Sequence, residues 1–567
     1  MNPDALCRNL QPMYPLAQSK VPAAISIQSL RWIAALASGG LLALAFPPLE
    51  WSQCAWAALL PLLLAVAGSA PRLAFQLGFA TGGVFWFFNL AWLRRLFQTA
   101  EAPAPLLVVA WILLAAYCAL YTGAFAYLWA WVFARVGKRG LGGSLAALLA
   151  APVIWIGLEY LRGALGVYGF AWNGLGISQY RHLPLLQTAR WTGVYGLSGI
   201  IVLLNAGLAL SLLRHLPGFH LLKNAEDGAG ATSRSGVLHV ELWVGLAVLT
   251  GAVLLGMQVL RQALPEGRLW TVAAVQPAIP QAAKWDEVHI AWIVTSLDQL
   301  TREALRAQPR PDLILWPETT TPGPTTQEGV SRDCVLSLLT NGVPILVGAI
   351  DVRGGPGDQQ RIFNSALLYV PDEGLVAWYD KQRLVPFGEF LPLESLFPIL
   401  ARWSPLDVSC TFGRTPTVFC ETNQPPFAAL ICFEDTQSGL ARTLVQRGAR
   451  LLVNLTNDAW FDRTACPQQH LSHSVFRAVE SGVPLIRAAN SGVTALVDGR
   501  GAIHNPTVNR SGVPPEAAVR VWRFAVPPGD APLTPYTRYG DWPLAIPCLA
   551  ATLLLALLVW RQPRFFK

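Results

Sequence analysis

Long apolar segments recur through the first half of the chain, separated by short polar stretches. About 20 apolar residues are enough to cross a bilayer as a helix. The pattern predicts about eight such spans, seven of them before residue 262: 31–48, 53–69, 73–96, 105–133, 143–161, 190–213, 239–260 and 543–560. The first span follows a long polar stretch and is followed at once by another span, which argues against a cleaved signal peptide.

Residues 263–541 follow a different pattern, in which short β-rich runs alternate with helical stretches. Several runs are apolar at nearly every position, as expected of strands that are covered on both faces. The predicted strands are Trp270–Val275, Leu313–Trp316, Ile345–Ala349, Ala366–Val370, Phe427–Cys432, Leu451–Leu455 and Thr494–Val497. The chain is therefore expected to comprise a cytoplasmic segment (1–30), a polytopic α-helical membrane domain (31–262), an α/β domain (263–541) and a last span with a basic tail (542–567).

The composition supports a membrane protein, since 53% of residues are hydrophobic and only 13% are charged. An average soluble domain has about 25% charged residues. The net charge of +8 lies in the apolar parts: residues 1–262 hold 16 basic and 7 acidic residues, whereas 263–541 hold 23 and 27. No folded basic domain remains to bind nucleic acid, so we expect no nucleic-acid partner.

Basic residues beside the spans predict the orientation of the chain, because Lys and Arg are enriched in cytoplasmic loops. Four basic groups fall on one side if both termini are cytoplasmic, whereas Arg94 and Arg95 fall on the other side. Residues 263–541 would then face the periplasm of a bacterium with two membranes, in a multi-pass protein of the inner membrane. The four groups are Arg8, Lys20 and Arg31; Arg135, Lys138 and Arg139; Arg214, Lys223 and Arg234; and Arg561, Arg564 and Lys567.

The nine cysteines include no Cys-x-x-Cys pair, which disfavours a zinc ribbon or a thioredoxin-type site. Five of them lie in 263–541, and the sequence leaves open whether Cys410 pairs with Cys420. His470 and His473 are three residues apart, but no third ligand with suitable spacing follows. We therefore expect no metal.

Two segments of the α/β region carry charged side chains that suit catalysis. The apolar run Leu313–Trp316 leads into Glu318, and reactive groups of α/β enzymes lie at such strand ends. An acid at the start of a helix is an equally good interpretation. Further on, Lys381 and Glu389 flank a run with proline and glycine. An ammonium held in such a loop could stabilise an oxyanion, whereas a surface ion pair is the alternative.

A third segment ends the apolar run Phe427–Cys432 on a cysteine, which Glu434 and a predicted helix through Arg447 follow. A sharp turn after a strand exposes a nucleophile, as in nucleophile elbows. A helix N-terminus at Cys432 would lower the pKa of the thiol. A buried structural cysteine is the alternative, because this is the commonest place for a free thiol.

Together, Glu318, Lys381 and Cys432 at strand ends resemble the nitrilase, or carbon–nitrogen hydrolase, superfamily. The resemblance covers most of 270–525 and is highly specific. It includes the sequences of Val275–Gln281, Asn454–Phe461 and Arg477–Gly492. It implies an α-β-β-α sandwich with a catalytic Glu, Lys and Cys.

The apolar spans narrow this resemblance to bacterial apolipoprotein N-acyltransferases. Lys284–Trp285, the run from Lys381 to Glu389, and Phe170–Gly174 are similar to that family in particular. The family transfers an acyl chain from a phospholipid, typically phosphatidylethanolamine, to the α-amino group of a lipoprotein's diacylglyceryl-cysteine. Many members have Tyr after the cysteine, whereas this chain has Phe433, which excludes a hydroxyl role at that position.

The resemblance implies a ping-pong reaction without a cofactor. Glu318 would be the general base, Cys432 the nucleophile that holds the acyl chain as a thioester, and Lys381 the oxyanion stabiliser. Glu389 would orient Lys381 or the amine, and Glu434 would orient the triad. Nothing in the sequence demands more than a monomer. Candidates for substrate contact are Trp172, Trp285, Asn457 and Trp460.

Residues 390–403 follow Glu389 directly and are too apolar for an exposed loop. We expect a mobile arm at the bilayer surface, with a helix packed on the domain core as the alternative. A membrane-tethered amidase that releases acid to water is the competing function, although a tether needs one span rather than eight. A transporter or lipid scaffold is disfavoured by the intact Glu318, Lys381 and Cys432 and by the few ionisable residues in the spans.

Overall fold

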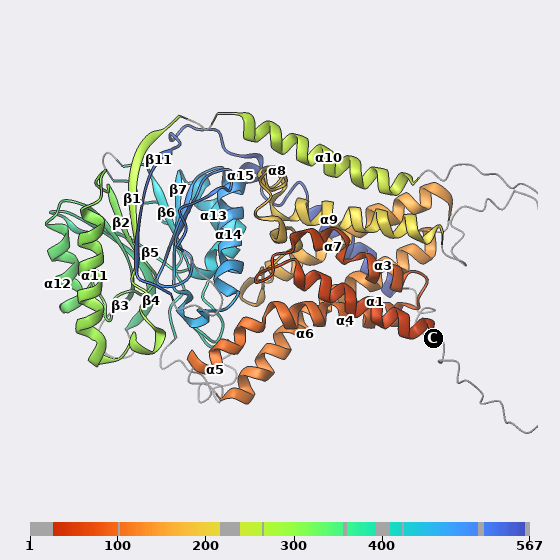
Figure 1. Ribbon diagram of the computed structural model, residues 1–567, viewed down its shortest axis with the longest axis horizontal. Coiled ribbons are helices and arrows are strands. Elements are labelled where there is room, and N and C mark those ends of the chain that lie inside the picture. The colour runs from red at the N-terminus through yellow and green to blue at the C-terminus, as the bar shows by residue number, and fades with distance from the viewer. Residues whose placement is uncertain are drawn as a thin grey trace, which may run out of the picture.

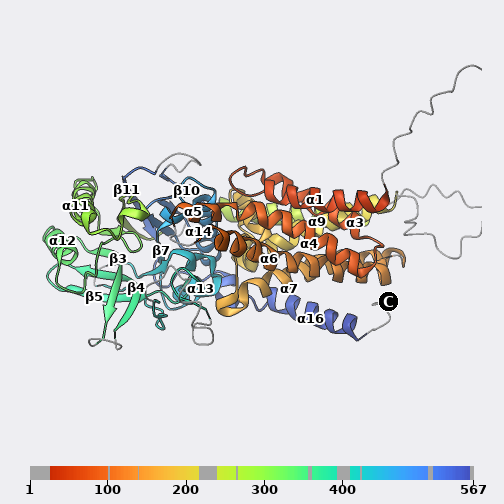
Figure 2. The same ribbon diagram turned by 90° about the horizontal axis from the view of Figure 1, so that it is seen from below.

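The chain folds into a bundle of long helices and a sheet-bearing half that lie end to end (Figure 1). The computed structural model describes residues 26–99, 103–137, 139–215, 239–263, 266–354, 360–392, 409–421, 424–507 and 515–561. The C-terminal helix α16 (Ala545–Trp560) leaves the sheets and returns along the bundle (Figure 2). Residues far apart in the sequence therefore share each half.

The bundle contains five described helices that are long and apolar enough to cross a membrane, or six if one bent pair counts as a single span. The segments expected at 53–69 and 543–560 form shorter apolar helices, Ser52–Val66 and Ala545–Trp560. Five or six of the eight predicted segments are thus full-length spans in the described part of the chain, and the other two are shorter apolar helices at the predicted places. The five are α1 (Ile27–Leu44), α6 with the turn that follows it (Ala104–Gly137), α7 (Gly140–Ala164), α9 (Ala189–Leu213) and α10 (Val240–Arg261); the bent pair is α4 (Pro71–Asn89) with Ala91–Thr99.

The segment at 53–69 is short because its helix is built in pieces, η1 (Ser52–Cys54), α2 (Ala55–Ala58) and α3 (Leu60–Val66). Asn205 on α9 holds this break: its side-chain oxygen accepts from the backbone N–H groups of Leu59 and Leu60 at 2.9 and 3.1 Å. The short elements α5 (Leu96–Thr99) and α8 (Leu183–Leu186) complete the described bundle.

Two sheets form the other half. The six-stranded sheet has the order β11-β1-β2-β3-β4-β5 and the five-stranded sheet the order β10-β9-β8-β7-β6. The strands are β1 (Arg268–Gln276), β2 (Leu313–Trp316), β3 (Ile345–Arg353), β4 (Arg361–Val370), β5 (Gly374–Asp380), β6 (Phe427–Ile431), β7 (Leu451–Thr456), β8 (Leu485–Ala489), β9 (Ala495–Val497), β10 (Ile503–His504) and β11 (Ala518–Val526). All seven predicted strands are present. The prediction missed β5, β8, β10 and β11.

Alternate residues of each strand serve different cores. Val272 and Ala274 of β1 pack between the sheets, whereas Ala273 and Val275 pack under the outer helices α11 (Ile290–Leu305) and α12 (Val330–Leu339). The other sheet is covered by α13 (Ser438–Gln446) and α14 (Cys466–Ser481). The result is the predicted α-β-β-α sandwich.

The sandwich and the bundle share one hydrophobic core. Val475 and Phe476 of α14 belong to the same buried cluster as residues of α1, α4, α6 and α9. The short helix α15 (Pro535–Tyr539) also packs on α9. Arg95, which lies on the unexpected side of the bundle, pairs with Asp462 of the sandwich at 2.9 Å. That ion pair explains why a basic residue lies on this side.

Candidate active site

Glu318 lies just after the C-terminal end of β2 in the six-stranded sheet, and it is 5% exposed. Its Oε1 accepts hydrogen bonds from Lys381 Nζ at 3.0 Å and Asn364 Nδ2 at 2.8 Å. Its Oε2 accepts from the backbone N–H of Asn457 at 2.9 Å. Both carboxylate oxygens are thus fixed by donors from other strands and loops.

Lys381 follows β5 and is shared between two carboxylates. Its Nζ lies 3.0 Å from Glu318 Oε1 and 2.8 Å from Glu389 Oε1. Asn364 of β4 bridges the same two oxygens, since its Nδ2 also donates to Glu389 Oε1 at 2.8 Å. The other oxygen of Glu389 accepts from the backbone N–H of Val385 at 2.8 Å. Glu389 is therefore placed to hold the Lys381 ammonium.

Cys432 directly follows β6 on a sharp turn. Its φ of 52° lies in the left-handed region, where a non-glycine residue is strained. The turn is the five-residue 3-10 segment η9 (Cys432–Thr436), and α13 begins only at Ser438. The elbow expected at Cys432 is present. The α-helix N-terminus expected there is not, so the sequence argument for a lowered thiol pKa was wrong.

The electrostatics of the three groups follow from burial and from their charges. Burial, followed by the Glu318 carboxylate, raises the pKa of the Cys432 thiol, and Lys381 offsets only part of this. Burial would also raise the pKa of Glu318, but the Lys381 ammonium and the hydrogen bonds from Lys381 and Asn364 outweigh it and lower that pKa. The resting site therefore holds a neutral thiol beside an ionised base.

Lys284 is a second buried ammonium at this place. Its Nζ donates to Thr319 Oγ1 at 2.6 Å and to the backbone oxygen of Glu318 at 3.3 Å. Burial lowers its pKa to about 7, and the charge of the Glu318 carboxylate opposes this only in part. Trp285, the next residue, is 55% exposed.

Glu434 is fully buried and ties the Cys432 turn to the Lys381 loop. It accepts from Tyr379 Oη and from the backbone N–H groups of Gln382, Arg383 and Ile431, at 2.6 to 3.0 Å. Burial raises the pKa of its carboxyl to about 7, although these donors favour the charged form. Its contacts are those of a residue that orients the other groups.

A buried polar network lies beneath the cysteine turn. His470 Nε2 lies 3.2 Å from the Cys432 carbonyl oxygen and 3.0 Å from Asp435 Oδ1, and its Nδ1 lies 2.9 Å from Asp458 Oδ1. Arg487 of β8 pairs with both aspartates. This network supports the turn from below. It is no metal site: the described residues hold no group of three or more His, Cys, Asp or Glu side chains that could bind an ion.

Three aromatic rings stand side by side next to the cysteine. The Trp172 and Phe433 rings are 6.2 Å apart and inclined by 10°, and Phe170 lies 6.3 Å from Phe433 at 17°. Trp172 is 3% exposed. Its predicted effect on substrate contact must therefore be transmitted by the other rings of this buried stack. The stack joins the Phe170–Gly174 loop of the bundle to the turn that holds Cys432.

Other predicted site residues lie nearby with their polar groups engaged inside the protein. The side-chain oxygen of Asn457 accepts from Asn490 Nδ2 at 2.9 Å, and its Nδ2 donates to Gln281 at 3.0 Å. Half-buried Trp460 accepts a hydrogen bond from Thr99 through its carbonyl. Of the expected arm at 390–403, residues 393–403 lie outside the described part of the chain. All eight cysteines in the described part are free, including Cys410 and Cys420.

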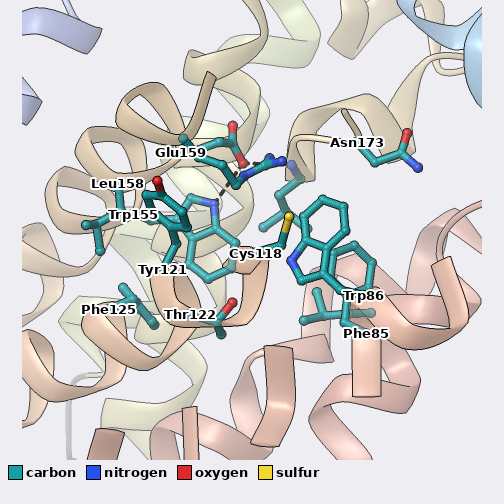
Figure 3. A pocket seen from close by; sticks show the side chains of 13 residues that line it. Phe85, Trp86, Cys118, Tyr121, Thr122, Phe125, Trp155, Leu158, Glu159 and Asn173 are labelled. Carbon is teal, nitrogen blue, oxygen red and sulfur yellow. Dashed lines mark hydrogen bonds between the residues drawn. The ribbon is translucent and has the colours of Figure 1, made fainter. Parts of the chain in front are cut away.

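A small cavity of about 40 Å³ opens among α4, α6 and α7 below the aromatic rings. Phe85 and Trp86 lie on one side of it, and Trp155 and Phe125 on another (Figure 3). Such a volume holds a few water-sized molecules, so an acyl chain would need the walls to move. Trp86 connects this cavity to the stack, because its ring lies 6.1 Å from Phe170.

Both halves of the chain match families of known proteins. The model of the apolipoprotein N-acyltransferase N-terminal domain matches residues 38–207, and the carbon–nitrogen hydrolase model matches 271–517. The apolipoprotein N-acyltransferase of Geobacter metallireducens is 36% identical over 538 residues, which cover 94% of this chain and 95% of the relative. That of Allorhizobium ampelinum is 32% identical over 83% of this chain and 87% of the relative. The chain belongs to the apolipoprotein N-acyltransferase family.

A solved structure of a nitrilase-superfamily protein, Nit3 of Saccharomyces cerevisiae, aligns with 47% of this chain and 92% of its own chain. Its TM-score is 0.35 and its sequence identity 16%. The match of residues 271–517 to the carbon–nitrogen hydrolase model shows that the second half has the predicted nitrilase-type fold.

Sequence reasoning missed Asn364 and the His470–Asp458–Arg487 network. Asn364 and Ser365 are polar residues at buried positions of β4, beside its apolar run 366–370, which is a signal that the pattern offers. Arg487 likewise interrupts the apolar strand β8, and it is fully buried. A polar residue at a buried strand position needs partners, and both of these residues find theirs at the site.

Proposed function

We propose that this protein transfers an acyl chain from a phospholipid to the N-terminal amine of the diacylglyceryl-cysteine of apolipoproteins. Phosphatidylethanolamine is the proposed donor, and a Cys432 thioester is the proposed intermediate. The observation that carries the proposal is the union of a buried Glu318–Lys381 pair and Cys432 with a bundle of apolar helices in one continuous core. The near full-length relatives that bear the name support it.

In the first half-reaction, Cys432 Sγ attacks the ester carbonyl carbon of the phospholipid. Burial keeps the resting thiol neutral, so Glu318 takes its proton as the bond forms. Lys381 Nζ stabilises the negative oxygen of the tetrahedral intermediate. Glu318 then protonates the leaving glycerol oxygen, which departs as a lysophospholipid and leaves the acyl thioester.

In the second half-reaction, the α-amine of the acceptor attacks the thioester carbonyl. Glu318 takes a proton from the amine, and Lys381 again stabilises the oxyanion. The cysteine sulfur leaves and is protonated by Glu318, which restores the resting site. The products are an N-acylated lipoprotein and free enzyme, and the chemistry uses no cofactor.

We further propose a monomer in the bacterial inner membrane with the sandwich in the periplasm. The basic residues beside the apolar spans support this orientation. The pairing of Arg95 with Asp462 accounts for one of the two exceptions, Arg94 being the other. A periplasmic site would meet both the outer leaflet of the membrane and the exported lipoprotein.

The test is product analysis with purified protein in phosphatidylethanolamine vesicles and a synthetic diacylglyceryl-cysteine peptide. We expect the peptide to gain one acyl group on its amine, with an equal amount of lysophospholipid. Fatty acid released to water without peptide acylation would contradict the proposal and support the competing membrane-tethered amidase.

A further inference from the structure

Gln469 lies in the first turn of α14, at the junction of the two halves, and is 1% exposed. Figure 1 shows α14 on the side of the sandwich that faces the bundle. A primary amide can donate two hydrogen bonds and accept two. The side chain of Gln469 makes all four bonds with the N-terminal half of the chain.

The four partners come from different parts of the bundle. Gln469 Oε1 accepts from Trp92 Nε1 at 3.0 Å and from Trp172 Nε1 at 2.9 Å. Its Nε2 donates to the backbone oxygens of Pro47 at 3.0 Å and Asn89 at 3.2 Å. The amide therefore has a single orientation, because exchanging its oxygen and nitrogen would break every bond.

Trp172 connects this amide to the reactive cysteine. Its ring stacks on that of Phe433, the residue after Cys432. Its centroid also lies 5.7 Å from that of the His470 ring and 5.1 Å from that of the His473 ring. The indole N–H points to Gln469, so the amide fixes the rotation of the ring in its stack. A substitution at Gln469 therefore affects the position of a ring that lies next to the nucleophile.

We propose that Gln469 is a positioning residue for acyl transfer, which holds Trp172 against Phe433 so that the rings shield the Cys432 thioester from water. The inference rests on the proposed function, in which the thioester must survive between the departure of one lipid and the arrival of the next. Water competes with the amine throughout that interval. A closed wall of apolar rings beside the sulfur lowers the chance that water reaches the carbonyl.

The loss of the amide has a direct physical consequence. A side chain without hydrogen-bonding groups would leave the buried indole N–H of Trp172 unpaired, and such a group seeks another partner. The ring would turn away from its place beside Phe433, and the stack would open. The acyl-enzyme would still form, because none of the four hydrogen bonds of the Gln469 side chain goes to Glu318, Lys381 or Cys432.

The experiment measures the lifetime of the acyl-enzyme in the full-length protein without acceptor. The protein is loaded from phosphatidylethanolamine vesicles, separated from donor, and the Cys432 thioester is followed by mass spectrometry. The variants are Gln469→Met, which keeps the length of the side chain, and Trp172→Phe, which keeps a ring but removes the N–H. Trp92→Phe is the matched control: it removes an equivalent bond to the same oxygen and keeps an aromatic ring against Trp172, and the Trp92 ring does not stack on Phe433.

We expect Gln469→Met and Trp172→Phe each to shorten the lifetime on the order of tenfold, the factor that corresponds to one hydrogen bond. The loading rate of Gln469→Met should stay within about twofold of wild type, and Trp92→Phe should keep the wild-type lifetime. In the Trp172→Phe background, Gln469→Met should add little, since the proposed effect runs through Trp172.

Equal lifetimes in wild type and Gln469→Met would overturn the inference. So would a shortening by Trp92→Phe that matches Gln469→Met, because the amide would then only join the two halves. If Gln469→Met fails to fold, Trp172→Phe against Trp92→Phe decides alone. A wild-type protein that forms no thioester would instead refute the proposed function, which keeps the two failures distinct.

Discussion

At the scale of single residues, the site is a set of buried charges that fix one another. Lys381 lies between Glu318 and Glu389, and Asn364 donates to the same two oxygens as the ammonium. One positive charge and one neutral amide thus hold two carboxylates close together. The pKa of Glu318 stays below its ordinary value only while these donors are in place.

Replacing Asn364 with aspartate tests this arrangement. Asn364→Asp removes the donor and brings a third carboxylate to the pair, which raises the pKa of Glu318. We expect kcat/KM for acyl transfer to fall on the order of 10²-fold at pH 7 and to recover partly as the pH rises. Asn341→Asp, in a turn outside the site, should change neither kcat/KM nor its dependence on pH. An unaltered pH profile in Asn364→Asp would refute the role of Asn364.

His470 predicts a dependence of stability on pH. Burial and Arg487 oppose its protonation, but the carboxylates of Asp435 and Asp458 outweigh them and raise its pKa from 6.5 to about 9. A raised pKa stabilises the fold fully below the unfolded value, and this stabilisation is lost as the pH rises from about 6.5 through 9.

We therefore expect the apparent Tm in detergent to fall by several degrees between pH 6.5 and 9. In His470→Asn this slope should be much smaller, whereas His504→Asn, which changes an exposed His–Asp pair, should keep it. The same slope in wild type and His470→Asn would show that the network does not depend on this charge.

The sequence pattern pointed to Glu318, Lys381 and Cys432, and to Glu389 and Glu434 beside them, but it could not predict which groups hold Glu318. Glu318, Lys381 and Cys432 stand at strand ends, which a pattern reveals. The partners of Glu318 come from positions 46 and 139 residues away, at Asn364 and Asn457, and only the fold brings them together. The thiol pKa was misjudged because the sequence did not reveal how far burial and the Glu318 carboxylate raise it.

At the scale of elements, strand ends and close packing place the base. Gly348 in β3 lies against the segment that carries Glu318: a Cβ at that position would lie 2.2 Å from the Pro317 carbonyl oxygen and 2.8 Å from Glu318 Cα. The carbonyl oxygen of Gly348 also accepts from Thr320 N–H at 2.8 Å. The two neighbours can come this close only because position 348 has no side chain.

Gly348→Ala should therefore displace Glu318. We expect acyl transfer to fall by a factor of at least about 10, since misplacement of a reacting group by 1 Å can cost 10²-fold. Gly439→Ala on α13 is the control, because a Cβ there meets nothing within 4 Å, and alanine favours a helix over glycine. Wild-type activity in Gly348→Ala would contradict the account of how β3 places the base.

The predicted strands contain long apolar runs: β2 is apolar throughout, and β7 is apolar except for Asn454 and its last residue, Thr456. The missed strands carry polar or exposed positions. β11 at the sheet edge includes Arg520 and Arg523, and β8 includes Arg487. The predicted spans failed in length where Pro61 and the break at Leu59 divide a helix, because apolar composition does not reveal such breaks.

At the scale of the whole molecule, the sandwich rests on the bundle rather than on a tether. The continuous core across α14 and α9 and the Arg95–Asp462 pair fix their relation. The reacting groups therefore keep a constant position relative to the apolar helices, which suits a substrate that stays in the membrane. A charge pattern alone could predict the orientation of the chain but not this junction.

The orientation can be tested through Cys420, which is exposed in the sandwich. In intact spheroplasts we expect a membrane-impermeant maleimide to label it, because the sandwich should face the periplasm. Cys420→Ser serves as the control that assigns the signal. Labelling that appears only after lysis would place the sandwich in the cytoplasm and overturn the proposed topology.

The most direct test of the central claim is the mass of the Cys432 peptide after incubation with phosphatidylethanolamine and no acceptor. We expect one acyl group on that peptide, sensitive to hydroxylamine and discharged when a diacylglyceryl-cysteine peptide is added. Cys432→Ala should carry no adduct and transfer no acyl chain. An unmodified wild-type peptide, together with full transfer activity in Cys432→Ala, would contradict the account.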